Sequence, residues 1–181
     1  MRVISGHFRS RKLIEVNSDH TRETKDRVKE SIFNSIQGNL YDALVLDLFA
    51  GSGSLGIEAV SRGAKDVTFV DHMQEANQVI KQNITALSIE KISEIYFGDY
   101  GSFLEETYRK FDLILLDPPY KLNVLDDVIK TIAQKKLLTE DGIIVCLYSK
   151  NNTLKPENNG IIEYKKKAIG ITNVSIMKWG I

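Results

Sequence analysis

Short apolar runs alternate with stretches of helical spacing along this chain. Seven segments have the apolar content or the alternation of strands: 44–49, 67–70, 92–97, 111–116, 143–148, 161–169 and 171–179. Apolar residues at helical spacing predict helices over 24–36, 55–60, 76–87 and 124–136. Strands that alternate with helices predict an α/β fold with a doubly wound, mostly parallel sheet of seven strands. The last two segments alternate around Gly170 and predict an antiparallel hairpin at one end of that sheet.

The domain organisation follows from length and from the lack of linkers. At 181 residues the chain has the size of one domain with a substantial core. Residues 2–16 have the pattern of extended or hairpin structure with a break near Gly6. We therefore expect a single domain over 1–181, in which 1–40 form a basic hairpin and a helix and 41–181 form the core.

Composition excludes several classes of protein. The longest apolar runs last six or seven residues, which is too short for a membrane span or a signal peptide. The one cysteine, Cys146, lies in an apolar run, so we expect a core residue, no disulfides and a cytoplasmic location. His7, His20 and His72 have no partner at metal-ligand spacing, and we expect no metal site.

The formal net charge of zero hides basic ends and an acidic middle. Four cations and no anions occur in the first fourteen residues, namely Arg2, Arg9, Arg11 and Lys12. A further four cluster at the start of the first predicted helix: Arg22, Lys25, Arg27 and Lys29. Cations at a helix N-terminus oppose the helix dipole, so part of this cluster is predicted to face an anionic substrate or cofactor. Nucleic acid is one such polyanion, and a solvated basic face is the alternative.

The first predicted strand runs directly into Ala50-Gly51-Ser52-Gly53-Ser54-Leu55-Gly56, which has the G-x-G-x-x-G spacing. Glycines let the backbone approach a ligand, and free amides at the start of the following helix attract a negative group. Asp71 follows Gly51 by 20 residues (71 − 51), at the end of the next apolar run, where a carboxylate meets ribose hydroxyls. The pattern predicts a nucleoside cofactor without saying which one, and a tight turn without a ligand is the alternative.

Asp99 follows the third predicted strand, beside the glycine loop. Its carboxylate is suited to accept a hydrogen bond from an adenine amine. A turn or a helix cap is an equally good interpretation, because aspartate favours both.

The most apolar strand after the first ends in Asp117-Pro118-Pro119-Tyr120. Ligands of open α/β sheets bind at the carboxyl ends of the strands, which places this turn beside the glycine loop. Two prolines stiffen the turn, so the Asp117 carboxylate and the Pro118 carbonyl can both accept hydrogen bonds next to the Tyr120 ring. That set suits a planar group with an exocyclic amine. Acceptors on both amine hydrogens stabilise the positive charge that develops as the nitrogen attacks a methyl sulfonium.

The motifs resemble a known family. Asp47-Leu48-Phe49-Ala50-Gly51-Ser52-Gly53 resembles the first motif of S-adenosylmethionine-dependent methyltransferases, and Asp117–Tyr120 resembles the signature of those that methylate exocyclic amines. Arg2–Gly6, Arg11–Leu13 and Thr21–Phe33 are similar to the bacterial 16S rRNA guanine-N2 methyltransferases. The chain departs from that pattern at Ser10, where glycine is usual, at Glu23, where proline is usual, and near Ile169, where tyrosine is frequent.

The resemblance implies a class I, Rossmann-like methyltransferase that makes 2-methylguanosine in 16S rRNA, acting on rRNA or on an assembling small ribosomal subunit. It implies S-adenosylmethionine as the cofactor, and the residues expected to bind it are Asp47, Phe49, Ala50, Gly51, Gly53, Asp71 and Asp99. The guanine would lie flipped against Asp117, Pro118, Pro119 and Tyr120. The expected RNA contacts are Arg2, Arg9, Arg11, Lys12, Arg22 and Arg27. We expect a monomer with no membrane partner.

Three other functions fit parts of the sequence. The enzyme could methylate an amine of another RNA or a DNA base, although we find no separate target-reading domain. A nicotinamide-dependent oxidoreductase also fits the glycine loop with Asp71, but it has no use for Asp117–Tyr120. A non-catalytic RNA-binding or assembly factor would keep the loop without turnover.

Overall fold

The computed structural model describes residues 1–16 and 26–180. The α-helices are α1 (Asp26–Ser35), α2 (Ser54–Ser61), α3 (Gln74–Ala86), α4 (Tyr100–Glu106) and α5 (Leu125–Lys135). Two 3-10 turns, η1 (Gln37–Asn39) and η2 (Glu90–Ile92), precede β1 and β3. The strands are β1 (Leu44–Asp47), β2 (Asp66–Asp71), β3 (Ser93–Phe97), β4 (Phe111–Leu116), β5 (Leu138–Ser149), β6 (Glu157–Asn158), β7 (Ile161–Ile169) and β8 (Thr172–Trp179).

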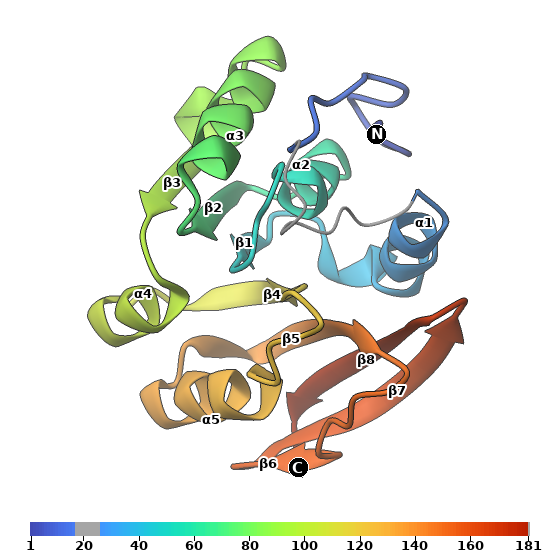
Figure 1. Cartoon of the computed structure of the whole chain (residues 1–181), viewed down its shortest axis with the longest axis vertical. Helices are drawn as coiled ribbons and strands as arrows, with labels where there is room; N and C mark the ends of the chain where they lie inside the picture. The colour runs from blue at the N-terminus through green and yellow to red at the C-terminus, as the bar shows by residue number, and fades with distance from the viewer. Residues whose placement is uncertain (17–25, 181) are drawn as a thin grey trace.

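All these strands form one sheet in the order β3-β2-β1-β4-β5-β8-β7-β6 (Figure 1). Neighbours among the first five strands of that order, β3, β2, β1, β4 and β5, pair in parallel. The pairs β5-β8, β8-β7 and β7-β6 are antiparallel. The α/β class is confirmed, but the prediction of a seven-stranded, mostly parallel sheet is wrong, because the sheet has eight strands and is mixed. The missed strand, β6, has two residues in a polar loop, too few to show a periodic pattern.

Helices cover both faces of the sheet, so the central parallel strands β1, β2 and β4 are buried on two sides, whereas β3 at the end of the sheet is partly exposed. One core cluster joins Ile32 and Phe33 of α1, Ile57 of α2 and Ile80 of α3 to one face. A second cluster joins Phe103 and Leu104 of α4, and Leu125 and Val128 of α5, to the other face. The apolar stripe predicted over 76–87 therefore packs in the core, as expected, and Cys146 is fully buried in the cluster on the opposite face.

Strand β5 and helix α4 differ most from the predicted elements. Strand β5 begins at Leu138 rather than residue 143, because a bulge after Phe111 lets the polar residues 139–142 continue the strand. Helix α4 was not predicted: it has seven residues and starts with Tyr100-Gly101-Ser102, which gives no helical period. The predicted loop 17–24, His20, Arg22 and Lys25 lie outside the described residues.

The N-terminal arm, residues 1–16, folds back on itself through an antiparallel bridge between Arg2 and Lys12. Ser10 lies in its turn with a φ of 68°, a region that favours glycine, and so the departure at this position carries a conformational cost. No helix within 1–16 and 26–180 is long and apolar enough to cross a membrane.

Candidate active site

The glycine loop and the Asp117 turn follow the carboxyl ends of two neighbouring strands of the sheet. Strand β1 pairs with β4 in parallel, with Asp47 opposite Leu115, and the two turns begin directly after these residues. Strand β2 lies on the other side of β1 and ends at Asp71, and β3 follows it and ends just before Asp99. The carboxyl ends of parallel strands meet at one edge, so the predicted cofactor and amine residues are brought together there.

Asp71 holds the glycine loop in place. Its Oδ2 accepts a hydrogen bond from the Gly51 amide (2.9 Å), and its Oδ1 accepts one from the Met73 amide at the start of α3 (2.9 Å). Each carboxylate oxygen has two acceptor sites, so these bonds leave acceptor capacity toward the edge of the sheet. Asp71 therefore has a structural role in the loop as well as the predicted role on a ribose.

The two loop glycines have different surroundings. Both have positive φ, 56° at Gly51 and 79° at Gly53. A Cβ on Gly51 would meet no atom within 4 Å, whereas one on Gly53 would lie 3.2 Å from the Phe69 ring. Gly51 thus faces open space that a ligand can approach, and Gly53 is needed for packing as well as for its backbone conformation. Asp47 is buried beneath the loop, where its Oδ2 accepts from the Gly56 amide (2.9 Å).

Asp99 is the N-cap of α4. Its Oδ1 accepts hydrogen bonds from the amides of Gly101 (2.8 Å) and Ser102 (3.2 Å), so the helix-cap interpretation is the one that the structure shows. A hydrogen bond to adenine stays a prediction. Beside the cap, the Phe49 and Tyr100 rings pack with centroids 4.9 Å apart, and partial burial, followed by the Asp99 and Asp127 charges, raises the pKa of the Tyr100 phenol. The carboxyl ends of the strands therefore carry an aromatic pair beside acidic side chains here.

Asp117–Tyr120 is fixed from two directions. The Tyr120 hydroxyl lies 2.8 Å from the Thr172 Oγ1 at the start of β8, and the Asn152 side chain donates to the Tyr120 carbonyl (2.8 Å). Pro118 is buried, and Asp117, Pro119 and Tyr120 are half-buried. The sequence did not indicate Thr172 or Asn152, since they are 52 and 32 residues from Tyr120 in the chain. Both stiffen the turn that the two prolines already restrict.

The predicted RNA contacts on the arm and α1 are exposed: Arg2, Arg9, Arg11, Lys12 and Arg27. Two of them also have partners within the protein. Arg2 forms an exposed ion pair with Asp26 (3.3 Å), and the Arg11 guanidinium donates to the Ala86 carbonyl at the end of α3 (2.8 Å). These bonds hold the arm against the body of the protein, and the role in RNA binding stays a prediction.

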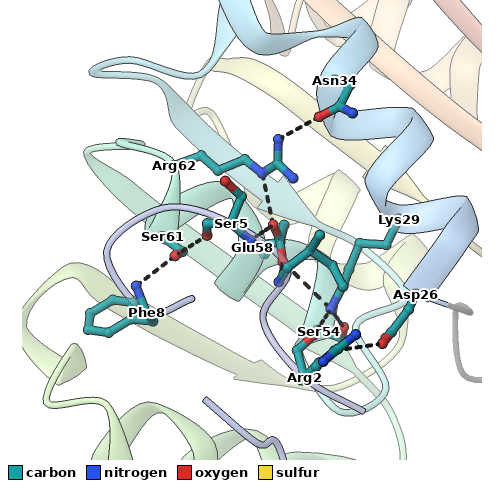
Figure 2. A network of polar contacts seen from close by, with 12 residues as sticks. Arg2, Ser5, Phe8, Asp26, Lys29, Asn34, Ser54, Glu58, Ser61 and Arg62 are labelled. Atoms are coloured by element: carbon teal, nitrogen blue, oxygen red, sulfur yellow. Dashed lines mark hydrogen bonds and ion pairs between the residues drawn. The ribbon is translucent and has the colours of Figure 1, made fainter. Parts of the chain in front are cut away.

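Lys29 does not face an external anion as predicted for the cation cluster. Its side chain is fully buried, and its Nζ donates to the Arg2 carbonyl (2.6 Å) and the Ser54 Oγ (2.9 Å), with Glu58 Oε2 at 3.7 Å (Figure 2). Glu58, also fully buried, accepts from the amides of Ile4 and Ser5 and from Arg62 Nε. We call Lys29, Glu58 and Arg62 the buried charge network. It joins the arm, α1 and the helix that follows the glycine loop.

Cys146 is not a candidate nucleophile. Burial, followed by the charges of Glu163 and Asp126, raises the pKa of its thiol well above the usual range. The thiolate is the reactive form, so this cysteine is inert in the folded protein. Within the described residues, no group of three His, Cys, Asp or Glu side chains could hold a metal ion.

Comparison with known proteins identifies the family. A family described as conserved hypothetical protein 95 matches residues 1–178. The ribosomal RNA small subunit methyltransferase D of Haemophilus influenzae is 35% identical over 96% of this chain and 91% of its own. YlbH of Bacillus subtilis, provisionally named an rRNA methyltransferase, is 40% identical over 98% of both chains. This chain is a member of that methyltransferase family.

A solved structure supports the same assignment. The Escherichia coli protein yhhF, provisionally titled a methyltransferase, is 27% identical and superimposes with a TM-score of 0.89 over 99% of this chain and 97% of its own. The match includes both the arm and the C-terminal hairpin, so the family fold extends over the whole described chain. Membership in a methyltransferase family removes the nicotinamide-dependent oxidoreductase as an alternative.

The edge of the sheet in this methyltransferase fits an S-adenosylmethionine ligand. Gly51 presents backbone to open space, Asp71 is fixed beside it, and the aromatic pair of Phe49 and Tyr100 lies next to Asp99. The amino-acid end of this ligand needs a close approach of backbone, its ribose needs a carboxylate, and its adenine needs a flat apolar contact. Gly51, Asp71 and the aromatic pair offer these three features in that order.

Proposed function

We propose that this protein transfers a methyl group from S-adenosylmethionine to the exocyclic 2-amino group of a guanine in 16S rRNA. The observation that carries the proposal is the position of Asp117–Tyr120, directly beside the glycine loop on the neighbouring strand. Family membership supports the reaction, and the names of the relatives support the small ribosomal subunit as the substrate. The whole described chain acts as one methyltransferase domain, with 1–40 facing the RNA.

The cofactor residues divide by strand. Asp47, Phe49, Ala50, Gly51 and Gly53 at the end of β1 would shape the methionine end, Asp71 would accept from the ribose hydroxyls, and Asp99 would accept from adenine. Bound S-adenosylmethionine supplies a methyl group on a sulfonium. Asp71 and its bond to Gly51 position the loop before the ligand arrives, which lowers the entropy lost on binding.

The chain's own groups act on the guanine amine. The Asp117 carboxylate and the Pro118 carbonyl accept the two amine hydrogens and draw the nitrogen toward a pyramidal geometry, which makes its lone pair available. The N–C bond would form as the C–S bond breaks, with S-adenosylhomocysteine as the leaving group. The Asp117 carboxylate would stabilise the positive charge on nitrogen until its proton passes to water. The Tyr120 ring stacks on the base, held by its hydroxyl at Thr172, so the amine is positioned in line with the methyl group.

The experiment measures methyl transfer from labelled S-adenosylmethionine to small ribosomal subunits from cells that lack this protein, and to a 16S rRNA transcript. Nucleoside analysis of the recovered RNA should show the label as 2-methylguanosine. Label in a different nucleoside would show that the target base is not guanine. Cofactor binding without label in either substrate would exclude 16S rRNA.

A further inference from the structure

The C-terminal hairpin carries an unneutralised basic surface beside the active site. Lys165, Lys166 and Lys167 are consecutive and exposed on β7. We call these three residues the β7 lysine ridge. The RNA contacts predicted from the sequence all lie within residues 2–27, and no proposed step of the reaction uses this ridge.

The ridge lies on an open edge of the sheet. Strand β7 pairs with β8 along its length, but its other side pairs only with β6, which reaches Ile161 and Ile162. Opposite Lys165–Lys167, no strand of the described chain covers that side. A ligand can therefore approach the ridge from outside the sheet.

The positive charges are not cancelled within the protein. In the described residues none of the three lysines forms an ion pair. Lys167 Nζ donates to the Ser31 Oγ of α1 (2.9 Å), and Lys166 Nζ lies over the Tyr148 ring at 5.6 Å. The nearest acidic side chain on the strand, Glu163, is hydrogen-bonded to the Ser175 hydroxyl. The contacts to Ser31 and Tyr148 are to neutral groups. The hydrogen bond to Tyr148, followed by the charge of Glu163, raises the pKa of the Lys166 ammonium, so this lysine stays charged although a carboxylate acts on it.

The ridge leads to the catalytic turn. Strand β7 ends at Ile169, which pairs with Thr172, and the Thr172 hydroxyl lies 2.8 Å from the Tyr120 hydroxyl. At about 3.4 Å per residue, Lys167 and Lys165 lie about 7 and 14 Å along the strand from that pair. The contact of Lys167 with Ser31 also joins the ridge to α1, which touches the arm through Lys29, and in Figure 1 α1 lies between the arm and this hairpin.

We propose that the β7 lysine ridge binds the phosphate backbone of the RNA that carries the target base. Lys165 and Lys167 pair with Ile176 and Val174 and so lie on the α1 face, whereas Lys166 pairs with Ser175 on the Tyr148 face. The three ammonium groups therefore straddle the edge, which suits a strand of phosphates that runs along it toward Tyr120. This inference rests on the proposed function, since it names the surface that holds that substrate.

Edge strands also carry lysines simply to prevent association with other sheets, and this is the competing explanation. The test uses Lys165→Gln/Lys166→Gln/Lys167→Gln and a control with the same loss of charge, Lys91→Gln/Lys110→Gln/Lys130→Gln. The control lysines are exposed: Lys91 and Lys110 precede β3 and β4 at the amino ends of those strands, and Lys130 lies on α5. A third variant with arginine at all three ridge positions keeps the charge.

Binding of a 16S rRNA transcript and of small subunits is measured from 50 to 200 mM salt. Each phosphate contact contributes about 0.7–0.9 to the slope of log Kd against log salt, so the ridge glutamine variant should lower the slope by about 2. Its Kd at 150 mM salt should rise about 10-fold or more, with KM for RNA rising, kcat unchanged and S-adenosylmethionine affinity unchanged. The control and the arginine variant should keep the wild-type slope.

Equal slopes of log Kd against log salt in all variants would overturn the proposal. An equal loss of RNA affinity in the ridge glutamine variant and in the control would also overturn it, because the effect would then come from net charge alone. Self-association of the ridge glutamine variant with intact RNA binding would establish the edge-protection explanation instead. A wild-type enzyme that binds neither RNA would overturn both this proposal and the proposed function. If the wild type methylates the RNA and the ridge glutamine variant keeps the wild-type slope, only the proposed role of the ridge is wrong.

Discussion

Replacing Glu58 by glutamine should destabilise the protein more than any surface substitution, because it breaks the buried charge network at its centre. The Glu58 carboxylate accepts from Ile4 N (2.8 Å), Ser5 N (3.0 Å) and Arg62 Nε (2.8 Å), and it is the counter-charge of Lys29 at 3.7 Å. Glutamine keeps one acceptor oxygen and turns an NH2 toward one of the two backbone amides. The two cations keep their charge.

The magnitude follows from these losses. Removing one partner of a buried ion pair costs about 3–5 kcal/mol, and leaving a buried amide without an acceptor costs about 1–3 kcal/mol. The two penalties overlap at one carboxylate, so we expect about 4–5 kcal/mol for Glu58→Gln. Lys29→Met should cost less, about 2–3 kcal/mol, because Glu58 then keeps Arg62 and both amides. Since domains of this size have a free energy of unfolding of about 5–15 kcal/mol, Glu58→Gln removes about a quarter of it or more.

Urea unfolding at fixed pH measures these differences. The control is Asp42→Asn, which breaks the exposed 4.0 Å pair with Lys65 and keeps a residue that tolerates the φ of 57°. That change should cost less than about 0.5 kcal/mol. The double variant Lys29→Met/Glu58→Gln should cost less than the sum of the single ones, by about 1–3 kcal/mol. A cost below about 1 kcal/mol for Glu58→Gln, or a larger cost for Lys29→Met than for Glu58→Gln, would refute the reasoning.

Three further predictions concern the arm, the cofactor loop and the core. Gly6→Ala should release the arm, because a Cβ there would lie 1.9 Å from the Ser61 carbonyl oxygen. Trypsin should then cleave after Arg9, Arg11 and Lys12 about 10-fold faster than in wild type. The control is Gly170→Ala, where φ is also positive and a Cβ would meet nothing within 4 Å, and equal cleavage of both variants would argue against the clash. Asp71→Ala should weaken S-adenosylmethionine binding about 10-fold or more, because the Gly51 amide loses its acceptor. Calorimetry measures this affinity, and kcat at saturating cofactor should stay close to wild type. An unchanged affinity would contradict the role of Asp71. Cys146 should resist a thiol-reactive dye in native buffer and react in urea, since burial raises its pKa and excludes the reagent; labelling of the native protein within minutes would contradict its burial.

Local patterns sufficed for the parts of the fold that are long and periodic. Strand β7 matches its predicted range, β8 starts one residue later than predicted, and α5 is one residue shorter than predicted at each end. Helix α5 buries a regular apolar stripe, which the sequence shows directly. The glycine loop and the Asp117 turn were both recognised, since each consists of consecutive residues whose backbone conformation depends on glycine or proline. Their adjacency followed from strand order, which parallel α/β folds restrict strongly.

The features that sequence reasoning missed depend on contacts between distant residues. Lys29 looks like a surface cation because its partner Glu58 belongs to another helix, 29 residues away (58 − 29). Tyr120 gives no sign of its bonds to Thr172 and Asn152, which come from β8 and from a polar loop. Asp99 had two interpretations of equal merit, an acceptor for adenine and a turn or helix cap. The amides of α4 show that it is a cap, and the hydrogen bond to adenine stays a prediction. A short helix and a two-residue strand fall below the length at which periodicity is informative.

The central claim is that Asp117 acts on the amine of a guanine, and single-turnover methyl transfer by Asp117→Ala tests it most directly. The variant is saturated with labelled S-adenosylmethionine and small subunits, and cofactor binding is measured on the same preparation. We expect cofactor affinity within about 3-fold of wild type and a methyl-transfer rate lower by about 100-fold or more, the size of one lost transition-state stabiliser. A wild-type rate in Asp117→Ala would contradict the mechanism and place the amine-binding group elsewhere.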